Sequence, residues 1–433
     1  MRTLFDLSEN NLARIKAHRF PTFQSASIGI FPFFHGLNLA NIPSSICQWF
    51  QIPTPQTGCL DIPDLPIYSD KIKNVILLLI DGLPFERMQS WLERGLRRSF
   101  FNSSWKFIQE KGMFTPLTSV VPSTTANALA SLWTGKFPSE HGVIGYELFL
   151  KEYDLILNMI LQTQVYPTLA TETKMTHFDL STFLPVPTLG SHLQNHGIQS
   201  FAFQHETICD SGLSRMLFPD VQKVPFISPQ DMWQKVNDLL DNQSSSRKYI
   251  YLYWGDIDTL SHHQGPNSRQ TRHAWNWFSH LLERFLSDRT SHAKGDTLLL
   301  VTSDHGQIPT EIRPTYEVRN DQEFMSFLEI PPSGESRLPY LFVKPDKTQA
   351  FREYVQQRWP DKFTLIPSTE MLASGLFGKK EMSQTIQNRL GNFIAIPKGD
   401  AFWWWANKEN HLLGRHGGFS PQEMITPLLI LPL

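Results

Sequence analysis

The stretch NVILLLIDG, residues 74–82, decides the fold class. Six consecutive apolar residues run directly into an Asp-Gly pair, and the segment 85–98 that follows has a helical composition. A short strand that is apolar on both faces is typical of a parallel sheet covered by helices on both sides. The stretch therefore predicts a strand-helix unit with a carboxylate, Asp81, at the carboxyl end of its strand.

The same pattern recurs twice along the chain. Residues 249–254 (YIYLYW) lead to Asp258, and residues 297–302 (TLLLVT) lead to Asp304. Two segments with a helical pattern accompany these strands: residues 229–240 and 268–288. Alternation of strands and helices predicts an α/β protein. Open α/β sheets bind ligands at the carboxyl ends of their strands, so the carboxylates are expected to meet there.

The length of 433 residues is enough for two or three structural units. We expect residues 1–70, rich in Pro, Phe and Ser, to form an irregular arm packed on the core. Residues 71–316 and 399–433 are expected to make up the α/β core. Residues 317–398 have a different pattern, with short strands on either side of a helix. This pattern predicts a small α+β cap inserted into that core.

Composition excludes several classes of protein. With 41% hydrophobic and 18% charged residues, the chain is not disordered as a whole. Its net charge of -2 gives no evidence for nucleic-acid binding. The three cysteines are too few and too scattered for a disulfide framework. The N-terminus lacks the apolar stretch of a secretory signal, and no apolar run approaches the roughly 18 residues of a membrane span. We therefore expect a cytoplasmic protein without a membrane span.

Histidines stand beside the carboxylates. His262 follows Asp258 by four residues, which is one turn of a helix, and His305 follows Asp304 directly. His416 opens a Gly-Gly turn that leaves room for a close approach to the backbone. Carboxylate and imidazole together suit Zn²⁺, with Mn²⁺ or Fe as alternatives. The candidate ligands, three for each of two ions, are Asp81, Asp258, His262, Asp304, His305 and His416.

Two metal ions about 4 Å apart can clamp the attacking and leaving oxygens of a phosphoryl transfer. Such a site needs a nucleophile, and residues 122–125 (PSTT) supply hydroxyl groups in front of a predicted helix. The N-terminus of that helix would also offer N–H groups to a phosphoryl oxygen. Each element alone has a simpler explanation, because Asp-Gly is a turn signal and Ser or Thr before a helix is commonly an N-cap.

Taken in order along the chain, these blocks resemble the alkaline phosphatase superfamily, and within it the type I phosphodiesterase/nucleotide pyrophosphatase family. The resemblance covers residues 73–307 and 414–433. Its most specific part is the string from Pro122 to Gly142, which contains TGKFPSEHG at 134–142. The other blocks are Asp81, Asp258 with His262 and Gly265-Pro266, Asp304-His305-Gly306, and His416-Gly417.

The resemblance implies an alkaline-phosphatase-like fold with a mostly parallel central sheet and helices on both faces. It also implies how the candidate ligands divide between two zinc ions. One ion would be held by Asp258, His262 and His416. The second would be held by Asp81, Asp304 and His305.

The resemblance also selects the nucleophile. The family threonine lies nine residues before the Thr of the Thr-Gly pair, here Thr134, which selects Thr125 over Thr124. Thr125 would attack phosphorus and form a phospho-threonine intermediate. The family keeps an Asn three residues after the threonine to hold a phosphoryl oxygen. This chain has Ala128 there, and Asn127 is the candidate substrate-binding substitute.

The expected function is a metal-dependent hydrolase that cleaves phosphodiester or pyrophosphate bonds of small molecules, nucleotides foremost. Phosphomonoesterase, phosphonate hydrolase and phosphomutase are alternatives within the superfamily. A sulfatase is disfavoured, because no cysteine has the Cys-x-Pro/Ala-Ser-Arg context of the modified nucleophile. A non-catalytic member is disfavoured too, because the six ligands and the threonine are all present. Trp403 to Trp405 are expected to pack in the core rather than to stack on a nucleobase.

Overall fold

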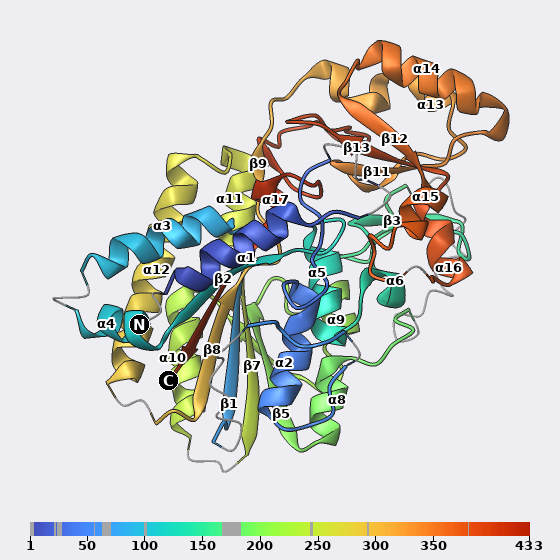
Figure 1. Ribbon diagram of the computed structural model, residues 1–433. Coiled ribbons are helices and arrows are strands. Elements are labelled where there is room, and N and C mark those ends of the chain that lie inside the picture. Colours follow the sequence, from blue (N-terminus) through green and yellow to red (C-terminus); the bar gives the residue numbers. More distant parts are fainter. Residues whose placement is uncertain are drawn as a thin grey trace.

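The computed structural model describes residues 4–20, 23, 28–55, 57–62, 71–98, 102–166, 183–242, 246–291, 294–379 and 381–433. Two sheets organise the described chain, a seven-stranded main sheet and a six-stranded second sheet (Figure 1). A short pair of strands, β9 (Ile308–Pro309) and β14 (Gly414–Arg415), forms a third, two-stranded sheet.

The main sheet is mostly parallel. Its strands, in spatial order, are β2 (Met113–Thr118), β15 (Ile425–Pro432), β8 (Thr297–Thr302), β1 (Asn74–Ile80), β7 (Arg247–Trp254), β5 (Ile198–His205) and β6 (Gln222–Phe226). The strands β8, β1, β7, β5 and β6 run parallel, and β15 runs antiparallel to both of its neighbours. β1 is buried over six of its seven residues, as an apolar strand covered on both faces should be.

Helices cover both faces of this sheet (Figure 1). One face carries α3 (Phe85–Leu96), α4 (Ser103–Lys111), α10 (Pro229–Asp241) and α12 (Arg269–Thr290). The other face carries α2 (Ile42–Trp49), α5 (Thr125–Thr134), α8 (Leu189–Asn195) and α9 (Gly212–Leu217). The α/β architecture expected from the three apolar strands is confirmed.

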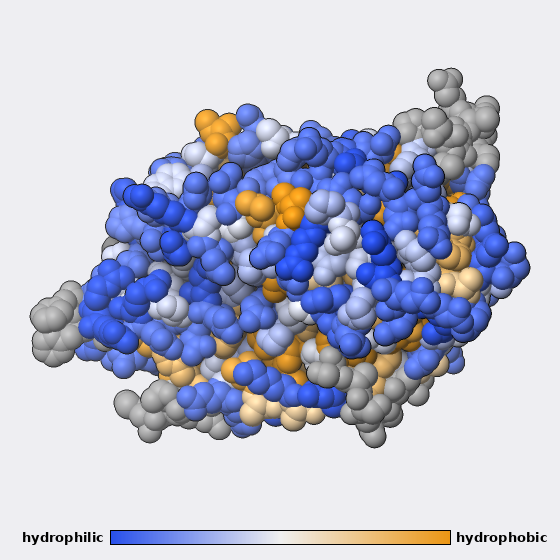
Figure 2. Space-filling model, turned by 90° about the horizontal axis from the view of Figure 1, so that it is seen from above, coloured by the Kyte–Doolittle hydropathy of each residue, from blue (hydrophilic) through white to orange (hydrophobic). Residues whose placement is uncertain are grey.

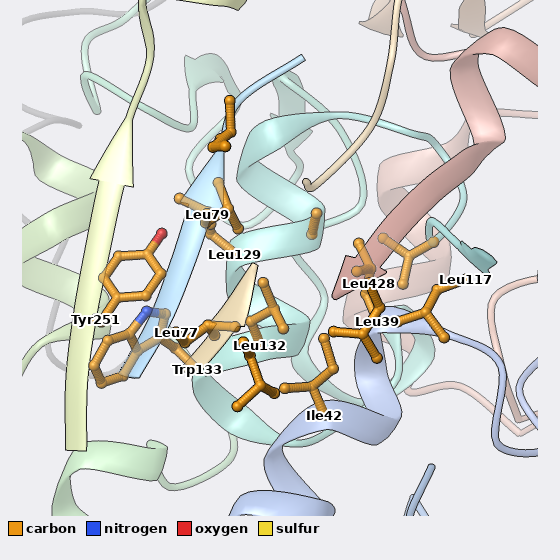
Figure 3. Packing of buried hydrophobic residues seen from close by; sticks show 14 of the residues in the cluster. Leu39, Ile42, Leu77, Leu79, Leu117, Leu129, Leu132, Trp133, Tyr251 and Leu428 are labelled. Carbon is orange, nitrogen blue, oxygen red and sulfur yellow. The ribbon is translucent and has the colours of Figure 1, made fainter. Parts of the chain in front are cut away.

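Apolar packing fixes the position of α5 against the main sheet. Leu129 and Trp133 of α5 lie against Leu77 and Leu79 of β1 and Tyr251 of β7 (Figure 3). The Trp133 and Tyr251 rings meet edge to face at 5.3 Å. Full burial of one such large side chain contributes about 1.5–3 kcal/mol. The first residue of this helix, Thr125, is therefore held at a defined place beside the sheet.

The N-terminal segment contains helices that the expectation of an irregular arm did not include. They are α1 (Asp6–Ala17), the 3-10 helix η2 (Leu39–Asn41) and α2. The Asn11 amide donates to the Thr115 hydroxyl on β2 at 2.8 Å, and the Asn38 amide donates to the Ser119 carbonyl at 3.0 Å. These buried contacts hold the segment on the β2 edge of the main sheet.

The second sheet is antiparallel and is built from two distant segments of the chain. Its strands, in spatial order, are β12 (Phe363–Pro367), β13 (Phe393–Pro397), β11 (Leu338–Leu341), β10 (Ser333–Glu335), β3 (Glu147–Leu150) and β4 (Leu155–Asn158). β3 and β4 precede the 317–398 segment by some 160 residues or more, so the sheet is larger than the cap predicted from the sequence. The boundaries of the predicted units stay a prediction.

The remaining helices lie around the second sheet or in the loops of the main sheet. They are α6 (Pro138–His141), α11 (Asp256–Gln264), α13 (Gln322–Ser326), α14 (Thr348–Arg358), α15 (Ser368–Ala373), α16 (Gln384–Gln387), α17 (Pro421–Met424) and the 3-10 helices η4 (Pro314–Tyr316), η5 (Val318–Asn320), η6 (Pro345–Lys347) and η7 (Asn388–Leu390). The second sheet has its own apolar core, in which Trp403 stacks on Phe363 at 4.2 Å. The three consecutive tryptophans are buried there, as expected from the sequence.

The face seen in Figure 2 is predominantly hydrophilic and carries only small hydrophobic patches. Within the described ranges, none of the helices combines the length and the apolar character needed to cross a bilayer. The cytoplasmic location expected from the sequence stays a prediction.

A buried ion pair joins the two sheets. Arg337, in the hairpin between β10 and β11, donates from Nε and Nη2 to both carboxylate oxygens of Glu423 in α17, at 2.7 and 2.8 Å. Its Nη1 donates to the carbonyls of Gly399 and Ala401. Burial alone would raise the pKa of Glu423, but Arg337 and the surrounding donors hold that pKa below its usual value. The pair ties the second sheet to the loop that carries His416.

Replacing one partner of this pair should destabilise the protein strongly. Arg337→Met leaves the Glu423 charge buried without a counterion, which costs about 3–5 kcal/mol of unfolding free energy. Glu423→Gln in the same chain should recover much of the loss, because it removes the orphaned charge. Urea unfolding of Arg337→Met and of the double variant with Glu423→Gln measures this. Arg313→Met, in the exposed Arg313–Glu311 pair, is the control and should cost less than about 1 kcal/mol of unfolding free energy. Equal losses at Arg337 and Arg313 would contradict the assignment.

Candidate active site

Parallel pairing brings the predicted carboxylates to one edge of the main sheet. Ile80 of β1 is in register with Trp254 of β7, and Leu79 is in register with Thr302 of β8. The chain therefore leaves all three strands at the same edge. Asp81 comes directly after β1, Asp304 follows β8 by two residues, and Asp258 lies in the first turn of α11.

A glycine allows two of these strand ends to approach. Gly82 has a left-handed backbone with φ of +70°. A Cβ atom at this position would lie 3.1 Å from Cβ of Asp258 and 3.0 Å from its Cα. Both the conformation and the close approach therefore require glycine after Asp81. The Asp-Gly pair noted in the sequence serves the geometry of the site as well as that of the turn.

The three predicted histidines share one orientation. Nδ1 lies 2.9 Å from the Gly414 carbonyl in His262, 3.0 Å from the Ser123 carbonyl in His416, and 3.2 Å from the Gly306 carbonyl in His305. A carbonyl oxygen only accepts, so Nδ1 carries the proton in each ring. Nε2 is then left with a lone pair. This is the arrangement in which a backbone carbonyl orients a metal-binding imidazole.

These Nε2 atoms face carboxylate oxygens. His262 and His416 point to Asp258 at 3.4 and 3.9 Å. His305 Nε2 lies 3.5 Å from Asp81 and 3.5 Å from Asp304. A lone pair opposite a carboxylate oxygen is repulsive unless a proton or a metal ion lies between them. The structure therefore brings all six predicted ligands together.

Among the described residues, the possible ligand atoms form two groups in which all atoms lie within 4.8 Å of one another. One is Asp81, Asp304 and His305, as predicted. The other contains Asp258 and His416 together with His305, where the prediction had His262. The His305 and His416 rings stack at 3.8 Å, which puts His305 between the two groups. His262 still contacts Asp258 and lies 5.1 Å from His416, ring centre to ring centre.

Unpartnered oxygens show that these residues suit a metal. Oδ1 of Asp81 and Oδ2 of Asp304 are buried without a hydrogen-bond partner among the described residues. Burial, with the nearby charges of Asp304 and Asp258, raises the pKa of Asp81 well above its usual value. Burial also lowers the pKa of His416 well below its usual value, so this imidazole is neutral. Buried carboxylates beside neutral imidazoles need either protons or a cation to compensate their charge, and a metal ion can serve this role.

The structure distinguishes between the two candidate nucleophiles. The Thr125 hydroxyl lies 3.1 Å from Nε2 of His305 and 3.4 Å from Oδ2 of Asp81. The Thr124 hydroxyl instead donates to Glu335 at 2.5 Å. Thr125 is therefore the hydroxyl that faces the ligand groups, which agrees with the choice that the family resemblance implied.

Asn127 lies in α5 and is fully buried. Its amide nitrogen donates to the Pro122 carbonyl at 2.9 Å, which ties the helix to the preceding loop. Its carbonyl oxygen has no partner among the described residues. Contact of Asn127 with substrate stays a prediction. Ala128, at the family's Asn position, is also buried.

Three further residues take part in the site, and two of them, Tyr253 and Glu335, carry no sequence signal that sets them apart. The Tyr253 hydroxyl donates to Oδ2 of Asp81, and the Gln307 amide donates to Oδ1 of Asp258. Glu335, on β10, reaches the site from the second sheet. Tyr253 belongs to an apolar aromatic strand, and Glu335 to a short hairpin, so neither stands out by pattern. Only Gln307 had a hint, because it follows Asp304-His305-Gly306 directly.

A cavity of about 60 Å³ opens beside Thr125. Its lining is mainly apolar and aromatic. Tyr253, Phe218 and the leucines and isoleucines at 129, 160, 208, 213 and 217 line it together with Gln204, Ser211 and Ser214. Its volume is well below the roughly 300–1,000 Å³ of pockets that enclose drug-sized ligands. The cavity can therefore take a small apolar group next to the hydroxyl, but not a whole nucleotide.

Comparison with known proteins places this chain in a family. The sequence matches the type I phosphodiesterase/nucleotide pyrophosphatase family over residues 75–419. The chain belongs to this family. It is a hydrolase of the alkaline phosphatase superfamily, and the family is metal-dependent. No curated protein matches the chain by sequence search.

Solved structures confirm the fold of this phosphodiesterase family member. Murine ectonucleotide pyrophosphatase/phosphodiesterase 5, in an inactive form bound to AMP, is 17% identical, with a TM-score of 0.56 over 82% of this chain and 87% of that chain. The human protein of the same name is 17% identical, with a TM-score of 0.55 over 82% and 87%. Phosphonoacetate hydrolase from Sinorhizobium meliloti, with phosphonoacetate bound, is 14% identical, with a TM-score of 0.55 over 83% and 90%.

Removing the Tyr253 hydroxyl should weaken metal binding. Tyr253→Phe frees Asp81 from the donor that orients its carboxylate, and loss of such an orienting contact costs about 10–100-fold in metal affinity. Competition with a chromophoric zinc chelator measures the change. Tyr249→Phe is the matched control, because Tyr249 is buried in the same strand and its hydroxyl has no partner among the described residues. An unchanged affinity in Tyr253→Phe would contradict the orienting role.

The crowded carboxylates should make the metal-free protein less stable as pH rises. With its pKa raised in the folded state, Asp81 keeps a proton that the unfolded chain releases above about pH 4. Stability is therefore greatest below that pH and declines as pH rises through the folded-state pKa of Asp81. Asp304→Asn removes the neighbouring charge, so its advantage in Tm over the native chain should grow from pH 4 to pH 8. Thermal unfolding in the presence of a chelator measures this.

The exposed Asp346→Asn change is the control for that pH series, and its effect on Tm should not vary in the same way. In saturating zinc the native chain should have the higher Tm of the two, because Asp304→Asn has lost a predicted ligand. A constant difference between Asp304→Asn and the native chain across the pH range would show that the two carboxylates do not interact as described.

Proposed function

We propose that the protein hydrolyses phosphodiester or pyrophosphate bonds, with Thr125 as nucleophile and two zinc ions held by the six predicted ligands. The observation that carries the proposal is the position of the Thr125 hydroxyl, within 3.4 Å of both Asp81 and His305 at the amino end of α5. Asp258, His262 and His416 would hold one ion. Asp81, Asp304 and His305 would hold the other.

Thr125 attacks phosphorus and expels the alcohol or phosphate leaving group, which gives a phospho-threonine intermediate. Water then cleaves the phospho-threonine and restores the hydroxyl. When bound, the metal ions supply positive charge that lowers the pKa of the hydroxyl and compensates the charge that develops on the phosphoryl oxygens. Asp81 and His305 orient the hydroxyl, since both lie within hydrogen-bond reach of it.

Backbone groups can hold the phosphoryl oxygens. The N–H groups of Thr125, Ala126 and Asn127 form the first turn of α5 and have no acceptor within the helix. A helix N-terminus binds anions through such N–H groups and through its dipole. The attacking hydroxyl and these donors belong to the same turn, so a phosphoryl group can meet both.

The charge around the site favours a diester over a monoester. Among the described residues, no Lys or Arg forms an ion pair or hydrogen bond with Thr125 or with any of the six predicted ligands. Arg337, the buried guanidinium of the adjacent hairpin, is committed to Glu423. A monoester carries one more negative charge and gains more from an additional cation. A diester or pyrophosphate linkage is the better match.

Nucleotides are the substrate class that we propose within this chemistry. The family description names nucleotide pyrophosphatases, and the similar murine protein has AMP bound. The cavity beside Thr125 is too small for a nucleotide, so the nucleoside would lie across its mouth. Phosphonates are the second candidate, because phosphonoacetate hydrolase shares the fold.

Thr125→Ala should abolish turnover while leaving the metal in place. The variant lacks the attacking oxygen but keeps all six ligands, so kcat for bis-(p-nitrophenyl) phosphate should fall by about a thousandfold or more, as for other nucleophile deletions. Metal analysis should still find about two zinc ions per chain. Thr125→Ser keeps a hydroxyl and should retain part of the activity. Thr348→Ala, on α14 of the second sheet, is the matched control and should behave as the native protein.

The choice of test substrate separates the alternatives. Faster cleavage of bis-(p-nitrophenyl) phosphate than of p-nitrophenyl phosphate supports the diester assignment. The opposite order would contradict it and favour a monoesterase, and turnover of phosphonoacetate alone would favour a phosphonate hydrolase. Full activity in Thr125→Ala would rule out Thr125 as the nucleophile.

A further inference from the structure

The N-terminus of α5 lacks the cap that its sequence leads one to expect. Thr124 is the N-cap residue and has the extended backbone of a cap, with φ of -137° and ψ of 147°, yet its side chain accepts no hydrogen bond from the helix. Thr is favoured at this position because its oxygen accepts from a first-turn N–H. Among the described helices that follow a Ser or Thr N-cap, this is the only one left uncapped. The other six are capped by Thr188, Ser211, Ser228, Ser268, Ser383 and Ser420.

Glu335 accounts for the missing cap. The Thr124 hydroxyl donates to Oε1 of Glu335 at 2.5 Å and accepts no hydrogen bond from the helix. Glu335 lies on β10 of the second sheet, 211 positions along the chain from Thr124. Thr124 is 1% and Glu335 is 7% exposed, so water competes little for this contact. The side-chain conformation that reaches Glu335 leaves the first-turn N–H groups of α5 without the Thr124 oxygen.

The position of Glu335 is itself fixed by the loop that carries a predicted metal ligand. Gly417, next to His416, has φ of +109°, and a Cβ atom there would come within 2.9 Å of Cβ of Glu335. The loop is therefore packed directly against the Cβ and Cγ atoms of Glu335. A larger residue at 417 would displace Glu335 from Thr124.

Burial raises the pKa of Glu335 to about 8, with the Thr124 hydrogen bond opposing the shift and Glu147, Asp258 and Glu423 adding to it. A carboxyl group that is largely protonated near neutral pH adds little negative charge beside the proposed phosphoryl site. It can still accept the Thr124 hydrogen bond through its carbonyl oxygen.

We propose that Glu335 is a positioning residue that keeps the first turn of α5 open to a phosphoryl oxygen by holding the Thr124 hydroxyl away from it. The inference rests on the proposed function, because it gives those N–H groups a ligand. Without Glu335, Thr124 turns back and caps the helix. The Thr124 oxygen would then accept a hydrogen bond from the N–H of Ala126 or Asn127. The phosphoryl group would lose that donor.

Binding of inorganic phosphate to the zinc-loaded protein tests this directly by calorimetry. Glu335→Ala should weaken phosphate binding about five- to tenfold, which corresponds to the usual worth of one N-cap hydrogen bond. Glu335→Gln keeps an acceptor for Thr124 and should bind phosphate nearly as the native protein does. Zinc content, measured on each variant, should be unchanged.

A second pair of variants separates this mechanism from simple damage to the site. In a Thr124→Val chain there is no hydroxyl left to cap the helix, so adding Glu335→Ala should have little further effect on phosphate affinity. An equal loss in both backgrounds would overturn the proposal. A loss in Glu335→Gln as large as in Glu335→Ala would overturn it as well.

The outcome is distinguishable from a failure of the proposed function. Phosphate affinity is measured without turnover, whereas the proposed function is tested by the loss of diester hydrolysis in Thr125→Ala. Loss of hydrolysis in Thr125→Ala together with additive effects of the Thr124 and Glu335 changes would leave the hydrolase in place and refute the role of Glu335. Coupled effects on phosphate binding in a protein that cleaves no diester would uphold the role of Glu335 and refute the proposed reaction.

Discussion

Buried negative charge at the carboxyl edge of the main sheet is the constraint on which the rest of the site depends. Parallel pairing of β1 with β7 and β8 delivers Asp81, Asp258 and Asp304 to one place, where burial makes mutual repulsion strong. Protons or cations must compensate that charge. The surrounding histidines direct the Nε2 lone pairs inward because their Nδ1–H groups donate to backbone carbonyls. The whole arrangement is therefore organised around positive charge.

Apolar packing places the helix that begins with Thr125, the proposed nucleophile, and polar contacts with Asp81 and His305 then orient its hydroxyl. Leu129 and Trp133 pack α5 against β1 and β7 (Figure 3). Thr125, the first residue of α5, therefore lies at the sheet edge where the carboxylates meet. A helix N-terminus at that edge places partial positive charge next to the carboxylates. Sheet packing and site electrostatics thus favour the same placement of one helix, which is the consistency between levels expected of a well-specified fold.

The second sheet supports the site rather than standing apart from it. Its β10–β11 hairpin supplies Glu335 to the N-cap of α5 and Arg337 to Glu423, close to the His416 loop. Two nearby residues of one hairpin therefore contact both the start of α5, which carries the proposed nucleophile, and the helix next to the His416 loop. Movement of the second sheet would disturb both at once, which couples the shape of this unit to the chemistry at the main sheet.

The sequence by itself determined the parallel α/β core and the candidate ligands. Buried strands leave uninterrupted apolar runs, and Asp81, Asp304 and the Asp258–His262 pair stand at short, local distances from those runs. The tertiary structure alone decided which polar groups meet across the chain. It directed Thr125 to the carboxylates and Thr124 to Glu335, gave Tyr253 a role at Asp81, and drew β3 and β4 into the second sheet. Periodicity encodes burial, but the partner of a buried hydroxyl depends on residues hundreds of positions away, whose approach only the folded chain fixes.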